Sequence, residues 1–554
     1  MKRRHFLMGT LLPLTACNSD QDLDHIAGDF TGISFGRGHL LRPSISSGRT
    51  SSWPAPSVIH KTRVVIAGGG VAGLAAARAL RLRGMDDFAL LELEDEAGGN
   101  SRGGAVGGIP CPLGAHYLPV PGDDAPDVQN LLEELGLRQR VMGRWQIDER
   151  HLCHSPQERL FFNDEWQPGL LPVQGVGPDT LAQYARFAAL IAQAQKTAKW
   201  TIPVSNRPEV LVNAHLFAIT FDSYLSQNGL TDPHLRWYLD YCCRDDYGTG
   251  IATVSAWAGI HYFASRHGFH APGGEDGERE GVLTWPEGNA WLTRHLAAPL
   301  KDRLHTGWVV LRVADVKHGV EVDAYNPAQQ VTHRWLAERC INALPVFVAA
   351  RVVESPPDFL RTAALQTRYA PWLVANIHIN TPLFDRPGPA PAWDNVIYGD
   401  AANAKTGGGL GYVDAMHQSL RPVPGATVLT HYRALGDIAN GRRLLMDTPW
   451  ATWRDTILTE LSVAHPDIAS KTTRIDITRY GHAMAVPVPR VESQIGLKSS
   501  SKINSLLLKK ERSSLPRQRV SYAHSDWAGY SVFEEAFTMG HQAGHQAQQT
   551  LLSP

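Results

Sequence analysis

A short apolar strand followed by a glycine-rich turn and a helix limits the fold of this chain more than any other feature. Residues 64–67 form the predicted strand, and Gly68 permits the tight turn after it. Gly70 lacks a side chain, so a pyrophosphate can approach the backbone and the start of the next helix. Gly73 allows that helix to pack close to the strand. This order of features predicts a dinucleotide-binding β-α-β unit.

The second strand of the same unit ends in a carboxylate. Glu92 lies 19 residues after Gly73, at the separation where an acid binds ribose hydroxyl groups. Ala72, at the start of the predicted helix, is assigned to the same site. Because strand, glycines, helix and acid occur in the expected order, we predict dinucleotide binding. The alternative is an ordinary β-α-β unit with a glycine turn.

The first 17 residues resemble an export signal. Arg3 and Arg4 precede a short apolar run that ends at Cys17 and is too short to span a bilayer. This arrangement is similar to a twin-arginine signal with a lipoprotein cleavage site. It implies export of the folded chain by the twin-arginine machinery and a lipid anchor on Cys17, at the periplasmic or extracytoplasmic face of a membrane. The alternative is a plain secretory signal in which Cys17 is incidental.

Length, charge and cysteine content narrow the class of protein. Residues 18–57 are rich in Ser, Gly, Arg and Pro and are predicted to be a flexible tether. The remaining chain exceeds what one hydrophobic core holds, so we expect at least two domains. The formal net charge of −1 gives no electrostatic reason to expect a nucleic-acid partner. Five cysteines follow Cys17 without a CxxC pair, so neither a disulfide framework nor a metal site is predicted.

The segment after Glu92 carries a second cofactor signature. Gly98 and Gly99 are followed by Asn100 and Arg102. Here the chain resembles the flavin amine oxidase superfamily, which includes monoamine and polyamine oxidases, with protoporphyrinogen oxidase and phytoene desaturase as relatives. The resemblance implies an FAD cofactor whose ribose meets Glu92 and whose diphosphate meets the two glycines. Asn100 stands where the family has an arginine, and Arg102 is the alternative source of that charge.

Two further segments match the same superfamily. Gly114 and His116 belong to a glycine-aromatic turn that the resemblance places beside the flavin, whereas His116 could equally serve as a structural turn residue. Asn289 replaces the second glycine of a Pro-x-Gly-Gly turn. Val310, on the strand that follows, is implied to pair its backbone with the adenine.

The closing segment gives the second strong match. A strand ends near Asp526, which the resemblance assigns to the ribityl-phosphate part of FAD. Residues 527–530 are similar to the Trp-Ser-Gly-Tyr of monoamine oxidases, whose tyrosine forms one wall of an aromatic cage over the flavin. Tyr530 is therefore a candidate for contact with the substrate, with plain packing as the alternative. The last helix is implied to point its N-terminus at the flavin, and Glu535 in its first turn is assigned to the cofactor site.

The middle of the chain has a different character. A mostly helical pattern over residues 125–283 is typical of a separate substrate domain. Asp245 and Asp246 lie between Tyr241 and Tyr247 and form an aromatic-acidic group. This group either binds a cationic substrate or is a helix end with solvated acids.

The predicted fold class is α/β, with a Rossmann-like FAD-binding domain, discontinuous in sequence, and an inserted α+β substrate domain. The segment at 497–517 is predicted to be an exposed basic loop, with contact to an anionic membrane surface as the alternative. The predicted segments are the signal 1–17, the tether 18–57, FAD-binding parts 58–124, 284–350 and 475–554, and substrate-domain parts 125–283 and 351–474.

The leading functional hypothesis is an exported FAD-dependent oxidoreductase, an oxidase or dehydrogenase of amines. Polyamines are one candidate class, and a hydride would pass from the carbon beside the nitrogen to flavin N5. The first alternative is a flavoprotein of desaturase or protoporphyrinogen-oxidase type that acts on an apolar substrate. The second alternative is a flavin-binding protein without turnover.

Overall fold

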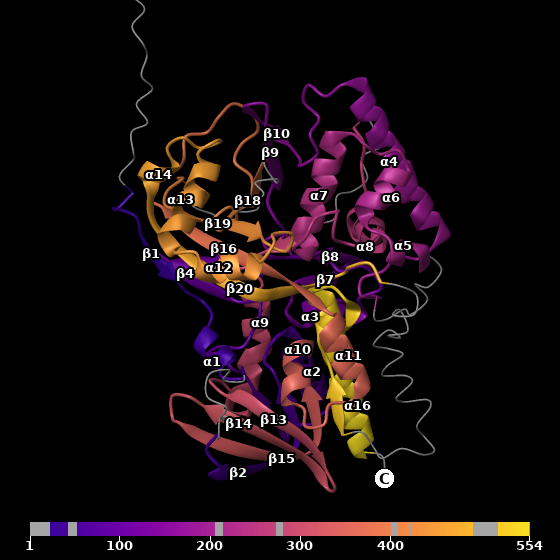
Figure 1. The fold of residues 1–554 in the computed structure, drawn as a ribbon, viewed down its shortest axis with the longest axis vertical. Coiled ribbons are helices and arrows are strands. Elements are labelled where there is room, and N and C mark those ends of the chain that lie inside the picture. Colours follow the sequence, from indigo (N-terminus) through magenta and orange to yellow (C-terminus); the bar gives the residue numbers. More distant parts are fainter. Residues whose placement is uncertain are drawn as a thin grey trace, which may run out of the picture.

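The computed structural model describes residues 23–42, 53–204, 214–272, 281–399, 408–419, 423–490 and 519–552. The predicted signal and the predicted basic loop lie outside these ranges. The described chain forms a lower and an upper part, each built around one large β-sheet (Figure 1). Within the described ranges, each helix is too short or too polar to cross a bilayer.

The lower sheet in Figure 1 contains the predicted nucleotide-binding unit. Its order is β12-β3-β2-β15-β14-β13, and β21 pairs with the end of β15. The pairs that join β12, β3, β2, β15 and β21 are parallel, whereas β13, β14 and β15 pair antiparallel. The strands are β2 (Val58–Ala67), β3 (Phe88–Leu91), β12 (Leu304–His305), β13 (Val309–Val316), β14 (Gly319–Asn326), β15 (Val331–Asn342) and β21 (Val520–Tyr522).

Two helices with small side chains lie against this sheet and against each other. They are α2 (Val71–Leu82) and α16 (Phe533–Leu552). A Cβ atom on Gly540 would lie 1.9 Å from the carbonyl oxygen of Ala72. The close approach of the two helices therefore requires glycine at this position. The helices α3 (Pro126–Glu134) and α9 (Ala290–Ala297) complete this layer, whose apolar side chains form one core with the sheet.

Among the described residues, the upper sheet has eight strands in the order β1-β20-β16-β19-β18-β17-β9-β10. Both faces are covered, since every residue of β19 is buried. Leu373 and Ala375 of β16 pack into the core beneath α13 (Trp450–Leu461), whereas Trp372 and Val374 pack into the helical side. The strands are β1 (Ala27–Phe30), β9 (Glu158–Phe162), β10 (Glu165–Pro168), β16 (Arg368–Ile379), β17 (Asp394–Ile397), β18 (Gly409–Asp414), β19 (Thr427–Ala434) and β20 (Thr472–Val486).

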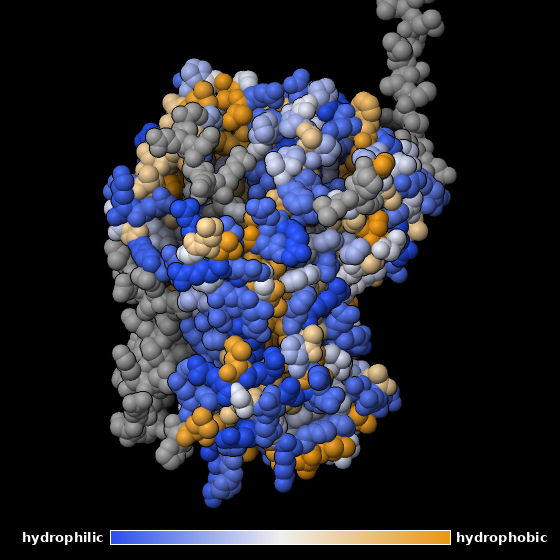
Figure 2. Space-filling model, turned by 180° about the vertical axis from the view of Figure 1, so that it is seen from behind, coloured by the Kyte–Doolittle hydropathy of each residue, from blue (hydrophilic) through white to orange (hydrophobic). Residues whose placement is uncertain are grey.

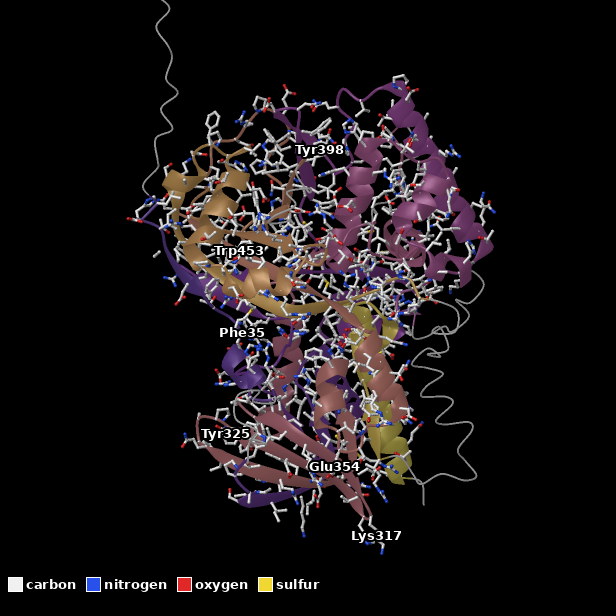
Figure 3. The ribbon with its side chains drawn as sticks, viewed as in Figure 1. Phe35, Lys317, Tyr325, Glu354, Tyr398 and Trp453 are labelled. Atoms are coloured by element: carbon white, nitrogen blue, oxygen red, sulfur yellow. The ribbon has the colours of Figure 1, made fainter. Side chains whose placement is uncertain are left out.

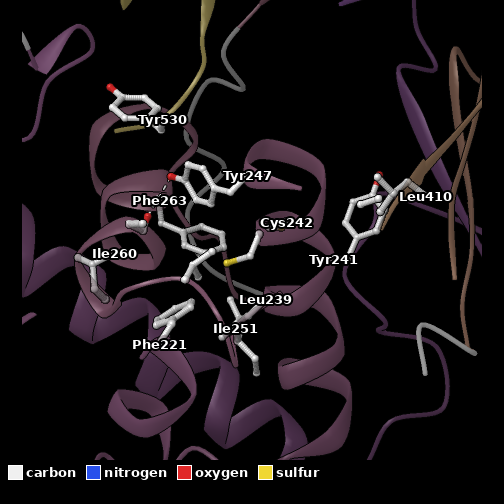
Figure 4. Close-up of a cluster of buried hydrophobic side chains, with 14 of the residues drawn as sticks. Phe221, Leu239, Tyr241, Cys242, Tyr247, Ile251, Ile260, Phe263, Leu410 and Tyr530 are labelled. Atoms are coloured by element: carbon white, nitrogen blue, oxygen red, sulfur yellow. Dashed lines mark hydrogen bonds between the residues drawn. The ribbon is translucent and has the colours of Figure 1, made fainter. Parts of the chain in front are cut away.

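The helical side of the upper part is held by capped helices around an aromatic core. Asp232 accepts a hydrogen bond from the Leu235 N–H at 2.9 Å and begins α7. Figure 4 shows Phe221 of α6 and Cys242 of α7 meeting Phe263 in this core. The helices are α4 (Pro178–Thr197), α5 (Ala214–Ala218), α6 (Phe221–Gln227), α7 (Pro233–Tyr247) and α8 (Ala256–Tyr262), followed by a π-helical turn at Phe263–His267.

The predicted tether is wrong for residues 23–42. These residues form β1, which pairs in parallel with β20, and the short helix α1 (Phe35–His39). The Ser34 N–H donates to the Glu94 carboxylate at 3.1 Å, and the Arg37 guanidinium donates to the Leu93 carbonyl oxygen at 3.1 Å. Figure 3 shows Phe35 at the junction between the lower and upper parts. Composition could not reveal this segment, because the pairing of β1 and the bonds of Ser34 and Arg37 are with distant parts of the chain.

Two predicted domain boundaries differ from the observed packing. The predicted third FAD-binding part starts at residue 475, inside β20, and β20 belongs to the upper sheet. The lower part resumes with β21 instead. Conversely, α3 was expected in the substrate domain, yet its Leu131 and Leu132 pack into the core of the lower part. Both differences have the same reason. Contacts between distant segments decide which part a strand or helix belongs to, and local periodicity does not report those contacts.

The face seen in Figure 2 is largely hydrophilic, with apolar side chains scattered over it. The most exposed large apolar side chain among the described residues is Met142, at 98% exposure. It lies at the tip of the hairpin formed by β7 (Arg138–Val141) and β8 (Arg144–Ile147).

Candidate active site

A cavity of about 780 Å³ lies between the two parts and is lined by residues of both. This volume falls in the range of small-molecule and cofactor sites, roughly 300–1,000 Å³. The cavity gathers predicted cofactor residues from all three predicted FAD-binding parts, 58–124, 284–350 and 475–554. Those that line it are Gly68, Gly70, Ala72, Glu92, Gly98, Gly99, Asn100, Gly114, Val310 and Asp526, together with His116. The structure does not place Gly73, Arg102, Tyr530 or Glu535 in this lining.

The glycine turn after β2 presents bare backbone to the cavity. Gly70 is the N-cap of α2, and no side chain caps the first N–H groups of that helix. Uncapped N–H groups and the helix dipole together favour an anion at this point. A Cβ atom on Gly73 would lie 1.9 Å from the Gly68 carbonyl oxygen, so Gly73 closes the turn from behind. The turn therefore fits a phosphate-bearing cofactor.

A second glycine pair lies beside this turn. The Gly98 N–H donates to the Gly69 carbonyl oxygen at 2.9 Å. A Cβ atom on Gly99 would lie 3.1 Å from Gly70 Cα, and Gly99 has φ +59°. Both the left-handed conformation and the close approach favour glycine. The two glycine segments thus form one continuous backbone surface at the cavity wall.

Glu92 lies at the end of β3 with both carboxylate oxygens engaged. One oxygen accepts from the Gly69 N–H at 2.7 Å and the other accepts from the Glu94 N–H at 2.8 Å. Burial raises the pKa of Glu92, and these two N–H groups partly oppose that rise. Val310, on β13, also lines the cavity. A carboxylate fixed in this way keeps lone pairs free for hydroxyl groups.

Asp526 is a buried carboxylate in the same cavity. The Tyr369 hydroxyl and the Val346 N–H donate to it at 2.6 Å and 3.0 Å, and His524 lies 3.2 Å away. Burial opposes ionisation, but His524 and these two donors outweigh it and lower the pKa of Asp526. The side chain is therefore ionised at neutral pH and joins the upper and lower parts through Tyr369 of β16.

The arginine position of the family motif is filled in an unexpected way. Asn100 lines the cavity and its side-chain amide donates to the Ala483 carbonyl oxygen at 2.7 Å. Arg102 points elsewhere, since it donates to the Gly32 carbonyl oxygen and lies 3.6 Å from the Glu94 carboxylate. Arg102 thus anchors the N-terminal segment rather than the cavity wall. Sequence analysis also missed the arginines that do line the cavity, because no motif surrounds them; they are Arg42, Arg266, Arg351 and Arg442.

Tyr530 is buried in the helical core of the upper part. Figure 4 shows Tyr530 at the edge of this core. Its hydroxyl donates to Glu535 at 2.7 Å, and its ring centroid lies 5.4 Å from that of His261. Glu535 also accepts from the Val204 N–H at 2.5 Å. Tyr530 therefore does not reach the cavity, where the predicted cage role would require it to lie. The cavity is reached by the three residues that follow Tyr530, so the motif is out of register.

Other aromatic side chains line the cavity instead. His116 stacks on Tyr432 with 4.4 Å between ring centroids and 24° between planes, and Tyr117 packs on His116 edge-on at 4.9 Å. Burial lowers the pKa of His116 to about 3, so its imidazole is neutral at physiological pH. Trp372 lines the same space. His116 thus acts as part of an aromatic wall and carries no charge there.

Acidic side chains open into the cavity from the end of α7. They are Asp245 and Asp246, the acids of the aromatic-acidic group. Burial and the neighbouring Asp246 raise the pKa of Asp245 to about 7. Burial also raises the pKa of Asp246 to about 6, although Arg266 opposes this rise. Arg266 itself forms an ion pair with Glu534, the acid before Glu535 in α16.

Solved structures with this architecture include amine oxidases. The structure of putrescine oxidase bound to putrescine has a TM-score of 0.62 and 16% identity, covering 89% of this chain and 100% of that one. Cyclohexylamine oxidase from Brevibacterium oxydans IH-35A has a TM-score of 0.60 and 18% identity with the same coverage. A fatty acid isomerase from P. acnes has a TM-score of 0.57 and 15% identity, covering 88% and 98%. These likenesses confirm the predicted α/β fold.

Sequence comparisons agree with the fold. Coproporphyrinogen III oxidase of Mycobacterium leprae (strain TN) is 34% identical over 137 residues, which is 24% of this chain and 29% of that enzyme. The chain thus matches less than a third of that relative's length. The model of the family described as flavin containing amine oxidoreductase matches residues 71–543. This match confirms the predicted flavin cofactor and the class of flavin-dependent oxidoreductases. The chain belongs to the family of flavin-containing amine oxidoreductases.

Proposed function

We propose that this protein oxidises an amine, with FAD as its electron acceptor. The observation that carries the proposal is the pair Asp245 and Asp246, which faces the cavity beside aromatic side chains. Arg266, the cavity arginine that opposes the raised pKa of Asp246, is already paired with Glu534. Two carboxylates therefore remain to meet a positively charged ligand. An ammonium group would stabilise their charged forms and lower their raised pKa values.

The cavity residues fit an FAD molecule. The uncapped start of α2 and the bare backbone of Gly70 and Gly99 suit a diphosphate, and Glu92 suits a ribose. When bound, FAD supplies the two-electron acceptor for a hydride. The rest of the work falls to the protein, which must bind the amine, remove its proton and keep water away.

The acidic pair is suited to the proton step. Amines carry a proton near neutral pH, and the nitrogen must lose it before the neighbouring carbon can release a hydride. With pKa values of about 7 and about 6, Asp245 and Asp246 are carboxylates in a large fraction of molecules at pH 7 to 8. A general base works best with a pKa near the operating pH. One of the two can therefore accept the ammonium proton inside the cavity.

The aromatic wall serves binding. Tyr117, Trp372 and Tyr432 present ring surfaces to the cavity near the acids. Aromatic faces attract cations and exclude water, which strengthens the pairing with the carboxylates. The names of two structural relatives, putrescine oxidase and cyclohexylamine oxidase, support an amine as substrate.

The test is an anaerobic absorbance titration of the FAD-loaded protein with a panel of monoamines, diamines and polyamines. We expect one or more amines to bleach the oxidised flavin band. The double variant Asp245→Asn/Asp246→Asn should bind FAD normally yet reduce the rate of bleaching at least 100-fold, as for loss of a general base. A wild-type flavin that stays oxidised with every amine would overturn the proposal.

A matched control separates the acidic pair from general effects of charge. Asp222 lies on α6 of the same helical side, is partly exposed and does not line the cavity. The variant Asp222→Asn should bleach at the wild-type rate. Equal losses in both variants would assign the effect to folding of the helical side rather than to the cavity acids.

A second candidate function is oxidation of a porphyrinogen. The segment of 34% identity with coproporphyrinogen III oxidase favours it. The same titration with coproporphyrinogen III distinguishes the two candidates. Bleaching by this compound, without bleaching by any amine, would assign the cavity to a tetrapyrrole.

We also propose that the chain is exported and lipid-anchored. Arg3, Arg4 and Cys17 support this proposal through their spacing around an apolar run. Cell fractionation tests it with three chains. The wild type should be found in the membrane fraction, Cys17→Ala should be released outside the cytoplasm, and Arg3→Lys/Arg4→Lys should stay in the cytoplasm. A wild-type chain in the cytoplasm would refute export.

A further inference from the structure

A second cavity of about 450 Å³ adjoins the cofactor cavity and differs from it in charge. It lies between α10 (Val346–Val352), the start of β16 and α12 (Gly441–Asp447). We call it the arginine cavity; its charged and aromatic lining residues are Arg351, Arg368, Arg442, His482, Tyr369 and Phe347.

The three arginines of this cavity are not neutralised by the protein. Among the described residues that line it there is no carboxylate, and none of the three arginines forms an ion pair within the described ranges. Arg442 donates to the Gly481 carbonyl oxygen at 2.6 Å, and Arg368 donates to the Gly436 carbonyl oxygen at 3.1 Å. These bonds orient the guanidinium groups while leaving their charge uncompensated.

The positive charge of the arginine cavity lowers the pKa values of cationic groups in and around it. Burial and then the nearby Arg442, Arg351 and Arg42 lower the pKa of His482 to about 4. Burial and Arg42 also lower the pKa of Arg442. The three arginines are exposed to solvent, which screens their mutual repulsion, and an anion that joins them would remove the repulsion that remains.

The arginine cavity is separate from the predicted cofactor site. None of the predicted cofactor glycines, nor Glu92, Val310 or Asp526, lines it. The two cavities nevertheless share five residues in their common wall: Phe347, Arg351, Tyr369, Arg442 and His482. A ligand held by the arginines would thus lie next to the cofactor cavity without replacing the cofactor.

We propose that the arginine cavity binds a small molecule through a carboxylate or phosphate group. Guanidinium groups bind both anions through paired N–H donors, and such charge-assisted bonds are the strongest hydrogen bonds in proteins. The open side of the cavity and its volume suit a small metabolite rather than a macromolecule. The proposal is independent of which substrate the cofactor cavity takes.

The experiment is calorimetric titration of the FAD-loaded full chain with inorganic phosphate and, separately, with citrate, against chloride at equal ionic strength. We expect saturable binding of one anion per chain. Arg351→Gln/Arg442→Gln should weaken it at least 10-fold. The matched control Arg443→Gln changes the adjacent arginine of α12, which is exposed like Arg442 but does not line the cavity, and should bind as the wild type. A heat of titration equal to that of chloride, or equal binding by the wild type and both variants, would overturn the proposal.

A second readout guards against a folding defect and identifies the source of the anion. Without phosphate, the double variant should have an unfolding temperature equal to or above that of the wild type, because repulsion has been removed. Because Arg351 and Arg442 also line the cofactor cavity, the FAD content of the variant is measured as the ratio of flavin to protein absorbance. Loss of FAD from the variant, with no phosphate binding by the wild type, would show that the cluster serves the cofactor's own diphosphate and would overturn the proposal.

Discussion

Burial makes Asp245 a source of pH-dependent instability. Its pKa is about 7 in the folded chain and ~3.9 in an unfolded one, so between these values the folded state binds the extra proton. Stability linked to this group is full below pH ~4 and is lost as the pH rises to about 7. We expect Asp245→Asn to raise the unfolding temperature at pH 8 by several degrees and to change it little at pH 4.

The check is thermal unfolding of the FAD-loaded protein at both pH values. In the control Asp222→Asn, the shift in unfolding temperature should be the same at pH 4 and pH 8. Equal shifts of Asp245→Asn at pH 4 and pH 8 would contradict the raised pKa. A variant that is more stable yet slower with amines would show that charge is kept in this wall at a cost in stability.

Gly540 is a residue whose missing side chain sets the distance between two helices. In Gly540→Ala the new methyl group would meet the Ala72 carbonyl oxygen at 1.9 Å, and α16 would have to move away from α2. Overpacking of this kind costs ~1–3 kcal/mol, more than the ~1 kcal/mol that alanine gains in helix propensity. Urea unfolding should therefore show a net loss. Gly36→Ala in α1, with no atom within 4 Å of the added Cβ, should be neutral.

At the scale of elements, the N-terminal segment 23–42 forms part of the cofactor cavity. Ile33, His39 and Arg42 line that cavity, and the segment precedes the residues that match the family. A chain that lacks residues 1–42 should lose FAD at least 10-fold faster, because one wall of the cavity and the pairing of β1 are gone. FAD fluorescence after dilution measures this rate. A chain that lacks only residues 1–22 is the control, and equal rates would refute the role.

The elements near the glycine turn could be predicted because their signals are local. The strand at 64–67 and the strand that ends at Glu92 were expected close to where β2 and β3 lie. The role of Tyr530 was not predictable, since a shift of one to three residues decides which side chain reaches the cavity.

The acid pair and the arginines illustrate a different limit. From the sequence, Asp245 and Asp246 could equally be solvated acids at a helix end. Only the walls of the cavity around them show that they belong to a site. Arg42, Arg351 and Arg442 are far apart in sequence, so nothing in their local patterns connects them. Such sites are created by tertiary contacts.

At the scale of the whole molecule, FAD should act as a bridge between the two sheets. Removal of FAD should lower the unfolding temperature, because a ligand at 100 times its Kd contributes ~2.7 kcal/mol to folding. The cavity draws residues from both parts, so near-UV signals from both should shift together. Re-addition of FAD is the control and should restore the transition. An unfolding temperature that does not depend on FAD would contradict this bridging role.

The early start of β1 changes how an anchored form of this protein would sit. If lipid is attached at Cys17, only five residues, 18–22, separate it from Leu23, whose carbonyl oxygen is bound by Arg454 of α13. Five extended residues reach at most ~18 Å. The tether predicted from composition would then be far shorter than residues 18–57, and the β1 edge of the upper sheet would lie close to the bilayer surface. Partners that diffuse in that membrane would then meet the enzyme from one side only.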